Sequence, residues 1–138
     1  MKQVSIYTLK VWLTTIVIAP IIVGFLHRYI DPEIYNYSSI LVGLLYCVPA
    51  GIIFCLPSWL LFWKLCSFVN DRTLKTIYKK LLITIPSVFL SLIPWLIINA
   101  HALFSPNYWP SFLPWVVSYS GVLIACVWIY KLAPVIKP

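Results

Sequence analysis

The chain carries few groups that could perform chemistry, and a set of histidines and carboxylates is the first to consider. His27, Arg28, Asp31 and Glu33 follow the first apolar run, and His101 follows a later one. If both runs end at the same side of a membrane, two imidazoles and two carboxylates could meet there and bind a divalent metal. The spacing sets no ligand geometry, however, and Arg28 has two acidic neighbours with which to pair at the surface. We therefore expect no metal and no cofactor.

Catalytic signatures are missing from the sequence. It contains no G-x-S-x-G elbow, no H-E-x-x-H pair and no phosphate-binding glycine loop. Charged side chains deep in a membrane mark proton relays and ion-coupled transport, and the centres of the apolar runs hold none. The four cysteines form no C-x-x-C pair, so we expect free thiols. The protein is therefore not expected to be an enzyme.

Three hydroxyl side chains, Thr84, Ser87 and Ser91, are spaced to share one face of a helix. In a channel built from several copies they could line an aqueous pore. Alternatively, each hydroxyl bonds to a backbone carbonyl one turn earlier or to a neighbouring helix. The sequence leaves both interpretations open.

Small residues form a ridge at four-residue spacing, which places them on one helix face. The members are Gly43, Cys47, Gly51 and Cys55. Small side chains let two helix backbones approach closely, which favours helix association in lipid. The ridge therefore predicts either packing within the protein's own bundle or a contact between copies.

Basic residues are concentrated between two apolar runs, on the segment from Asn70 to Leu81. They are Arg72, Lys75, Lys79 and Lys80. Asn70 or Asp71 could cap a helix that continues into the next apolar run, and this helix would present a basic face. That face could rest on anionic lipid headgroups, or it could bind an acidic cytoplasmic protein or a nucleotide-like signal.

The composition indicates that these groups are positioned by membrane-spanning helices. Of 138 residues, 62% are hydrophobic and 9% are charged, whereas soluble domains carry about 25% charged residues. A span needs about 20 apolar residues. The sequence predicts one all-α transmembrane domain over residues 1–138, an up-down-up-down bundle with helices at about 7–28, 38–63, 76–100 and 112–131.

Prolines fall inside all four predicted spans and predict kinks, because proline removes a helical hydrogen bond. They are Pro20, Pro49, Pro57, Pro86, Pro94 and Pro114.

Lysine and arginine residues determine orientation, since they are enriched in cytoplasmic segments. With four spans, only Arg28 lies on one side, and the other nine Lys and Arg residues lie on the opposite side. We therefore expect both termini in the cytoplasm, in the cytoplasmic (inner) membrane of a bacterium. The net charge of +7 then reflects orientation and contact with anionic lipid, and we expect no nucleic-acid partner.

Two functions remain as hypotheses. The first is a non-enzymatic membrane subunit or anchor that binds a protein partner. The second is a homo-oligomeric channel, pore or membrane-perturbing effector, in which the ridge forms the contact between copies and the hydroxyl stripe lines the lumen.

Overall fold

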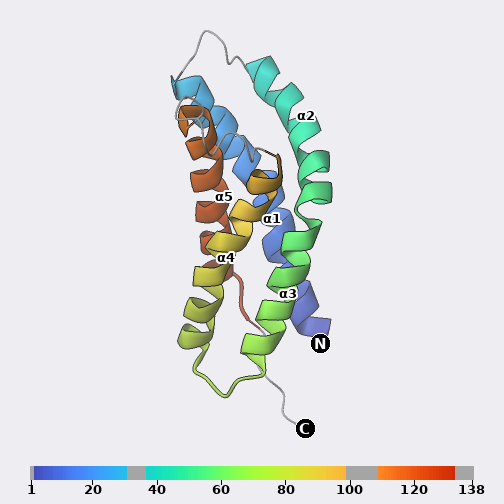
Figure 1. Ribbon diagram of the computed structural model, residues 1–138, viewed down its shortest axis with the longest axis vertical. Coiled ribbons are helices and arrows are strands. Elements are labelled where there is room, and N and C mark those ends of the chain that lie inside the picture. Colours follow the sequence, from blue (N-terminus) through green and yellow to red (C-terminus); the bar gives the residue numbers. More distant parts are fainter. Residues whose placement is uncertain (1, 31–36, 99–108, 133–138) are drawn as a thin grey trace.

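The computed structural model describes residues 2–30, 37–98 and 109–132, and these residues form five helices and no strands (Figure 1). The all-helical prediction is therefore confirmed. The helices are α1 (Lys2–Ile30), α2 (Tyr37–Phe54), α3 (Leu56–Asn70), α4 (Thr76–Ile98) and α5 (Trp109–Ile129).

Length and surface indicate an integral membrane protein. Gln3–Tyr29 in α1 and Thr76–Pro94 in α4 are each long and apolar enough to cross a membrane, and α2 with α3 gives a third candidate span. Large apolar side chains cover the outside of the helices; Leu45 and Ile129, for example, are 69% and 74% exposed. Contiguous apolar surface on this scale is incompatible with a soluble monomer, whereas lipid solvates it well.

The second apolar run is not the single helix over 38–63 that the sequence predicts. It is divided at Cys55 into α2 and α3, which meet at an angle of 55°, and α3 continues to Asn70. Pro57 explains the break, because it has no N–H to donate to the carbonyl of Ile53 and its ring crowds that carbonyl. The chain continues through the bend, since the Cys55 N–H bonds to the Gly51 carbonyl at 3.0 Å.

The segment after α3 also differs from the prediction. Asn70 ends α3 and Asp71 is its C-cap, with the Asp71 N–H donating to the Ser67 carbonyl at 3.1 Å. A non-helical connection follows, and α4 begins only at Thr76. Asn70 and Asp71 therefore end one helix and do not begin the next.

Much of the core lies between α1 and α5, which run in opposite directions side by side (Figure 1). Val11 of α1 and Val127 of α5 are fully buried there. The Tyr7 hydroxyl donates to the Val127 carbonyl at 3.2 Å, and the hydroxyls of Thr14 and Tyr130 are 2.8 Å apart. These bonds fix the register of the two helices.

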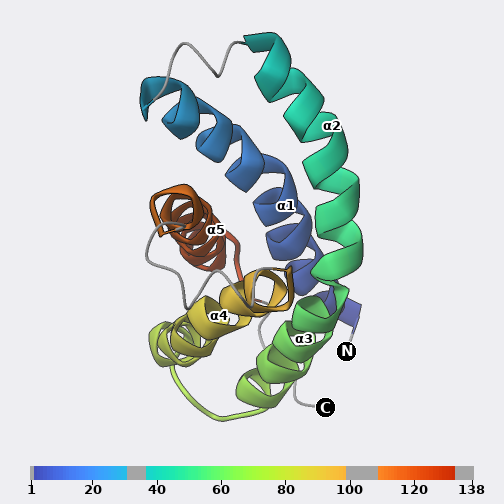
Figure 2. The ribbon, with the colours of Figure 1, turned by 45° about the horizontal axis from the view of Figure 1, so that its top comes forward.

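The other helices arrange themselves around this pair. α4 packs on α5 and α3, and α3 also packs on α1. α2 packs on α1, and its contacts with α4 and α5 are sparse within the described residues. α2 bends away from α3 and lies beside α1 (Figure 2).

Candidate functional site

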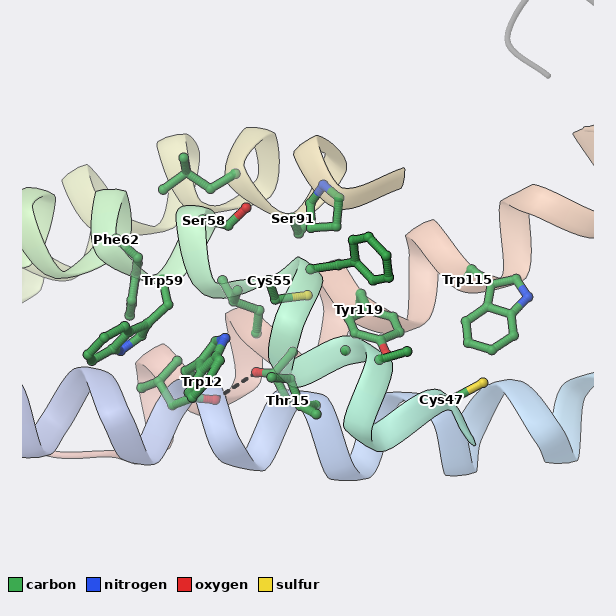
Figure 3. A pocket seen from close by; sticks show the side chains of 18 residues that line it. Trp12, Thr15, Cys47, Cys55, Ser58, Trp59, Phe62, Ser91, Trp115 and Tyr119 are labelled. Carbon is green, nitrogen blue, oxygen red and sulfur yellow. Dashed lines mark hydrogen bonds between the residues drawn. The ribbon is translucent and has the colours of Figure 1, made fainter. Parts of the chain in front are cut away.

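A cavity of about 270 Å³ lies at the bend between α2 and α3, and all five helices contribute to its wall (Figure 3). The wall is mostly apolar, with side chains such as Ile16, Phe54, Leu90 and Leu123. None of the lining residues is charged. The site is therefore suited to a hydrocarbon rather than to an ion.

The bend creates this space. Cys55, at the break, lines the cavity together with residues of α2 before it and of α3 after it. A straight helix would keep α2 and α3 collinear along α1. Because α3 packs on α4 while α2 leans on α1, the two halves diverge and the side chains between them do not fill the gap.

Two tryptophans close one end of the cavity. The rings of Trp12 and Trp59 lie 5.4 Å apart at 31°. Their Nε1 atoms and the Ser58 hydroxyl are buried and have no hydrogen-bond partner within the part of the chain that the structure describes. Burying such a group without a partner costs about 1–3 kcal/mol. Three of the five unpartnered buried atoms among the described side chains thus belong to residues that line this cavity.

Other polar groups of the wall are satisfied. The Thr15 hydroxyl donates to the Val11 carbonyl at 2.8 Å. The Ser91 hydroxyl donates to the Val88 carbonyl at 2.7 Å and lies 2.9 Å from the Ser120 hydroxyl of α5. Among the lining residues, the unpartnered buried atoms therefore belong to Trp12, Ser58 and Trp59.

The predicted ridge of small residues faces the interior over most of its length. Cys47, Gly51 and Cys55 line the cavity. A Cβ at Gly51 would lie 3.4 Å from Ile16 Cγ2, so α2 approaches α1 closely there, whereas a Cβ at Gly43 would meet open space. The small residues near the bend thus permit packing within the protein's own bundle. A contact between copies through Gly43 stays a prediction.

The predicted hydroxyl stripe also points inward. Thr84 donates to the Lys80 carbonyl at 2.8 Å, and Ser87, which is fully buried, donates to the Ile83 carbonyl. Ser91 alone of the three lines the cavity. Each hydroxyl thus bonds to its own helix, and that of Ser91 also to α5, as one of the two interpretations of the sequence expects. A pore lumen along this face stays a prediction.

The predicted basic residues separate into two pairs. Lys79 is buried and its Nζ donates to the Asn70 carbonyl at 2.6 Å. Lys80 Nζ donates to the carbonyls of Trp128 at 2.7 Å and Tyr130 at 3.1 Å. Both ammonium groups therefore bind helix ends within the protein.

The other pair remains at the surface. Arg72 and Lys75 are exposed, as is every residue from 71 to 78. The Arg72 guanidinium lies 4.4 Å from the centre of the Phe68 ring, which is the geometry of a cation–π contact.

The histidine set is only partly described. His27 Nδ1 forms a 3.0 Å hydrogen bond with the Val23 carbonyl, and its ring lies 6.3 Å from that of Trp115. Asp31, Glu33 and His101 lie outside the described residues. Among the residues that are described, no three His, Cys, Asp or Glu side chains gather as metal ligands.

Sequence reasoning missed the cavity. The positions of Trp12 and Trp59 in the sequence predict only aromatic residues near a membrane interface. A pointer was present in Pro57, which precedes Trp59 by two residues and marks where a helix can open. No protein-family model matches the sequence, and no curated protein or solved structure is significantly similar to it.

Proposed function

We propose that this protein is a non-enzymatic membrane subunit that anchors an acidic cytoplasmic protein at the cytoplasmic membrane of a bacterium. In this proposal the chain crosses the membrane four times, with α2 and α3 as one bent span and both termini in the cytoplasm. The apolar stretch Leu113–Ile129 of α5 is shorter than the other candidate spans, but it reaches the lower limit of about 17 residues for a crossing, which is compatible with a fourth span.

The observation that carries the proposal is the surface of residues 68–78. It combines the exposed cations Arg72 and Lys75 with exposed apolar side chains, notably Phe68, Ile77 and Tyr78. Arginine and aromatic residues are enriched in protein interfaces. The contact with Phe68 holds the guanidinium of Arg72 in place, so less side-chain freedom is lost when it forms a bidentate pair with a carboxylate.

A charge-reversal experiment tests this surface. Arg72→Glu with Lys75→Glu should reduce the amount of co-purifying partner by about tenfold or more, because like charges then face the acidic surface. The partner is the protein that co-purifies with the tagged wild-type chain after gentle solubilisation from its own host. Lys79 and Lys80 are left unchanged, since both bind helix ends within the protein.

The matched control reverses two other exposed cations, Lys10 and Lys131. This variant has the same net charge as the test variant and should retain the partner. Equal retention of the partner by the test variant and the wild type, with unchanged topology, would reject the proposed surface. Equal loss in both variants would show that total charge, rather than this surface, controls binding.

A further inference from the structure

α2 is held against the rest of the protein less firmly than the other helices. None of its side chains from Leu41 to Phe54 is buried, whereas each of the other four helices buries several of its described side chains. It packs mainly on α1, and its contacts with α4 and α5 are sparse within the described residues. In lipid no hydrophobic effect drives helices together, so packing is what holds them. The bundle therefore restrains α2 the least.

The cavity reduces the packing of α2 further. On its inner side α2 borders the cavity with Ala50, Gly51 and Phe54, among others, and atoms that face empty space have no contact partner there. Gly51 lies close to α1, since a Cβ at this position would lie 3.4 Å from Ile16 Cγ2. The other walls of the cavity come from helices that are anchored by buried side chains. α2 is thus the weakly held wall.

A single residue lies at the break between α2 and α3. Cys55 has a φ of -88° and a ψ of -4°, whereas residues within an α-helix have values near about −63° and −42°. Helical hydrogen bonds continue on both sides, from the Cys55 N–H to the Gly51 carbonyl at 3.0 Å and from the Trp59 N–H to the Cys55 carbonyl at 2.9 Å. The two backbone conformations adjoin in φ/ψ space. Cys55 can therefore act as a hinge at the end of an element.

The direction of the bend determines what this hinge does. From the break at Cys55, α2 turns away from the line of α3 and lies beside α1 (Figures 1 and 2). Straightening at Cys55 therefore lifts α2 off α1 and away from the cavity, while α3 stays packed on α1 and α4. Pro57 opposes complete straightening, because its ring crowds the carbonyl of Ile53.

We infer that α2 is a hinged lid, which opens the cavity toward the membrane by straightening at Cys55. Opening gives up the packing of α2 on α1. It exposes no apolar surface to water, because hydrocarbon solvates both the inner side of α2 and the cavity wall. This inference goes beyond the proposed anchoring function and does not depend on it, because neither α2 nor the cavity lining includes a residue of the surface 68–78.

Distances between spin labels on the full-length protein in lipid nanodiscs test the inference. Serine replaces the four native cysteines, and labels are attached at Leu41 on α2 and Phe25 on α1, which are both exposed. Leu41 lies about 21 Å from Cys55 along α2, so a swing of about 20° moves it by about 7 Å. We expect a main component for the closed lid and a second component that is longer by about 5–10 Å.

Pro57→Ala is the hinge variant, since it removes the crowding ring and supplies an N–H for the Ile53 carbonyl. The fraction of the longer component should rise by about twofold or more. Pro49→Ala is the matched control, because Pro49 lies within α2 and away from the break, and it should leave the fractions unchanged. A single narrow distance in both the wild type and Pro57→Ala would overturn the inference.

A reference pair of labels separates motion of the lid from loosening of the whole bundle. The labels are attached at Leu60 on α3 and Ile85 on α4, which are both exposed, and α3 packs on α4. Their distance should be single and the same in all variants. If it changes together with the distance between α1 and α2, the bundle moves as a whole and α2 is no lid.

The reactivity of a buried cysteine measures the opening of the cavity itself. Ser91 is buried and lines the cavity, so Ser91→Cys in the variant without native cysteines should react slowly with N-phenylmaleimide, an apolar reagent that enters lipid. With Pro57→Ala added, the reaction should accelerate by the same factor as the longer component grows. Phe89→Cys, exposed on the same helix, should react at an unchanged rate. Lengthening of the distance without faster reaction at Ser91→Cys would show that α2 moves without opening the cavity, and would reject the lid.

Discussion

At the scale of single residues, the lysines that begin α4 act as caps for other helices. The last carbonyls of a helix have no partner within it and carry partial negative charge. Lys79 binds the carbonyl of Asn70 at the end of α3, and Lys80 binds those of Trp128 and Tyr130 at the end of α5. Two neighbouring side chains thus join three helix ends, because successive residues of a helix point in different directions.

Replacing Lys79 by methionine tests this role. Lys79→Met keeps the length of the side chain but leaves the Asn70 carbonyl without its charged donor. We expect the free energy of unfolding to fall by about 1.5–3 kcal/mol, the usual contribution of a hydrogen bond to a charged group. The measurement is equilibrium unfolding in mixed micelles.

Lys75→Met is the control for this prediction, since Lys75 is exposed in the same segment. Surface substitutions change stability by about 0.5 kcal/mol or less. If the two variants unfold alike, the ammonium of Lys79 does not stabilise the end of α3.

The basic segment shows what sequence can and cannot establish about individual residues. Spacing correctly predicts that Lys79 and Lys80 lie near the start of a helix, at Thr76. It does not say where the ends of α3 and α5 lie, because these positions are set by contacts between residues far apart in the sequence. The sequence therefore predicts that the four cations form one surface. In the structure two of them are at the surface, and the other two bind helix ends within the protein.

At the scale of helices, prolines have unequal effects. Pro20, Pro49, Pro86 and Pro114 lie inside continuous helices, whereas the break before Pro57 bends the chain by 55°. The local effect of proline is the same at each position. What differs is packing, because α2 lies on α1 while α3 also contacts α4. The sequence predicts possible kinks, and tertiary contacts determine which one becomes large.

Replacing Pro57 by alanine should reduce the bend, since an alanine at this position has an N–H to donate to the Ile53 carbonyl. Spin labels at the exposed positions Tyr46 and Phe68 report the change, in a variant without native cysteines. A straight helix places these backbone positions about 33 Å apart, and the bent one about 29 Å apart. We expect the distance in Pro57→Ala to increase by up to about 4 Å.

Pro49→Ala is the matched control, because Pro49 lies within α2 and away from the break. It should leave the distance between the labels nearly unchanged. The same distance in Pro57→Ala and wild type would show that packing of α3 on α4, rather than the missing N–H, holds the bend.

At the scale of the whole molecule, composition predicts an all-helical membrane protein, because a surface with so large an apolar fraction requires lipid as its solvent. The cavity is not accessible to the same reasoning. Trp12 and Trp59 come from helices far apart in the sequence, and their rings meet only because α1 and α3 pack together. Hydropathy describes each span by itself, whereas a cavity is a property of how several spans fail to fill the space between them.

Orientation in the membrane is the last property to predict. The start of α1, the connection between α3 and α4, and the end of α5 lie at one end of the molecule, as the Trp63–Ser5 bond at 3.1 Å and the Lys80–Tyr130 bond show. Most lysines are at this end, so we expect it in the cytoplasm.

In a variant without native cysteines, Lys75→Cys should react with a membrane-impermeant maleimide only in inside-out vesicles. Tyr29→Cys, at the other end and 89% exposed, should react only in right-side-out vesicles or intact spheroplasts. Reaction of both cysteines from the same side would exclude an odd number of membrane crossings between Tyr29 and Lys75. A reversed pattern would place Arg72 and Lys75 outside the cell, where no cytoplasmic partner could bind them.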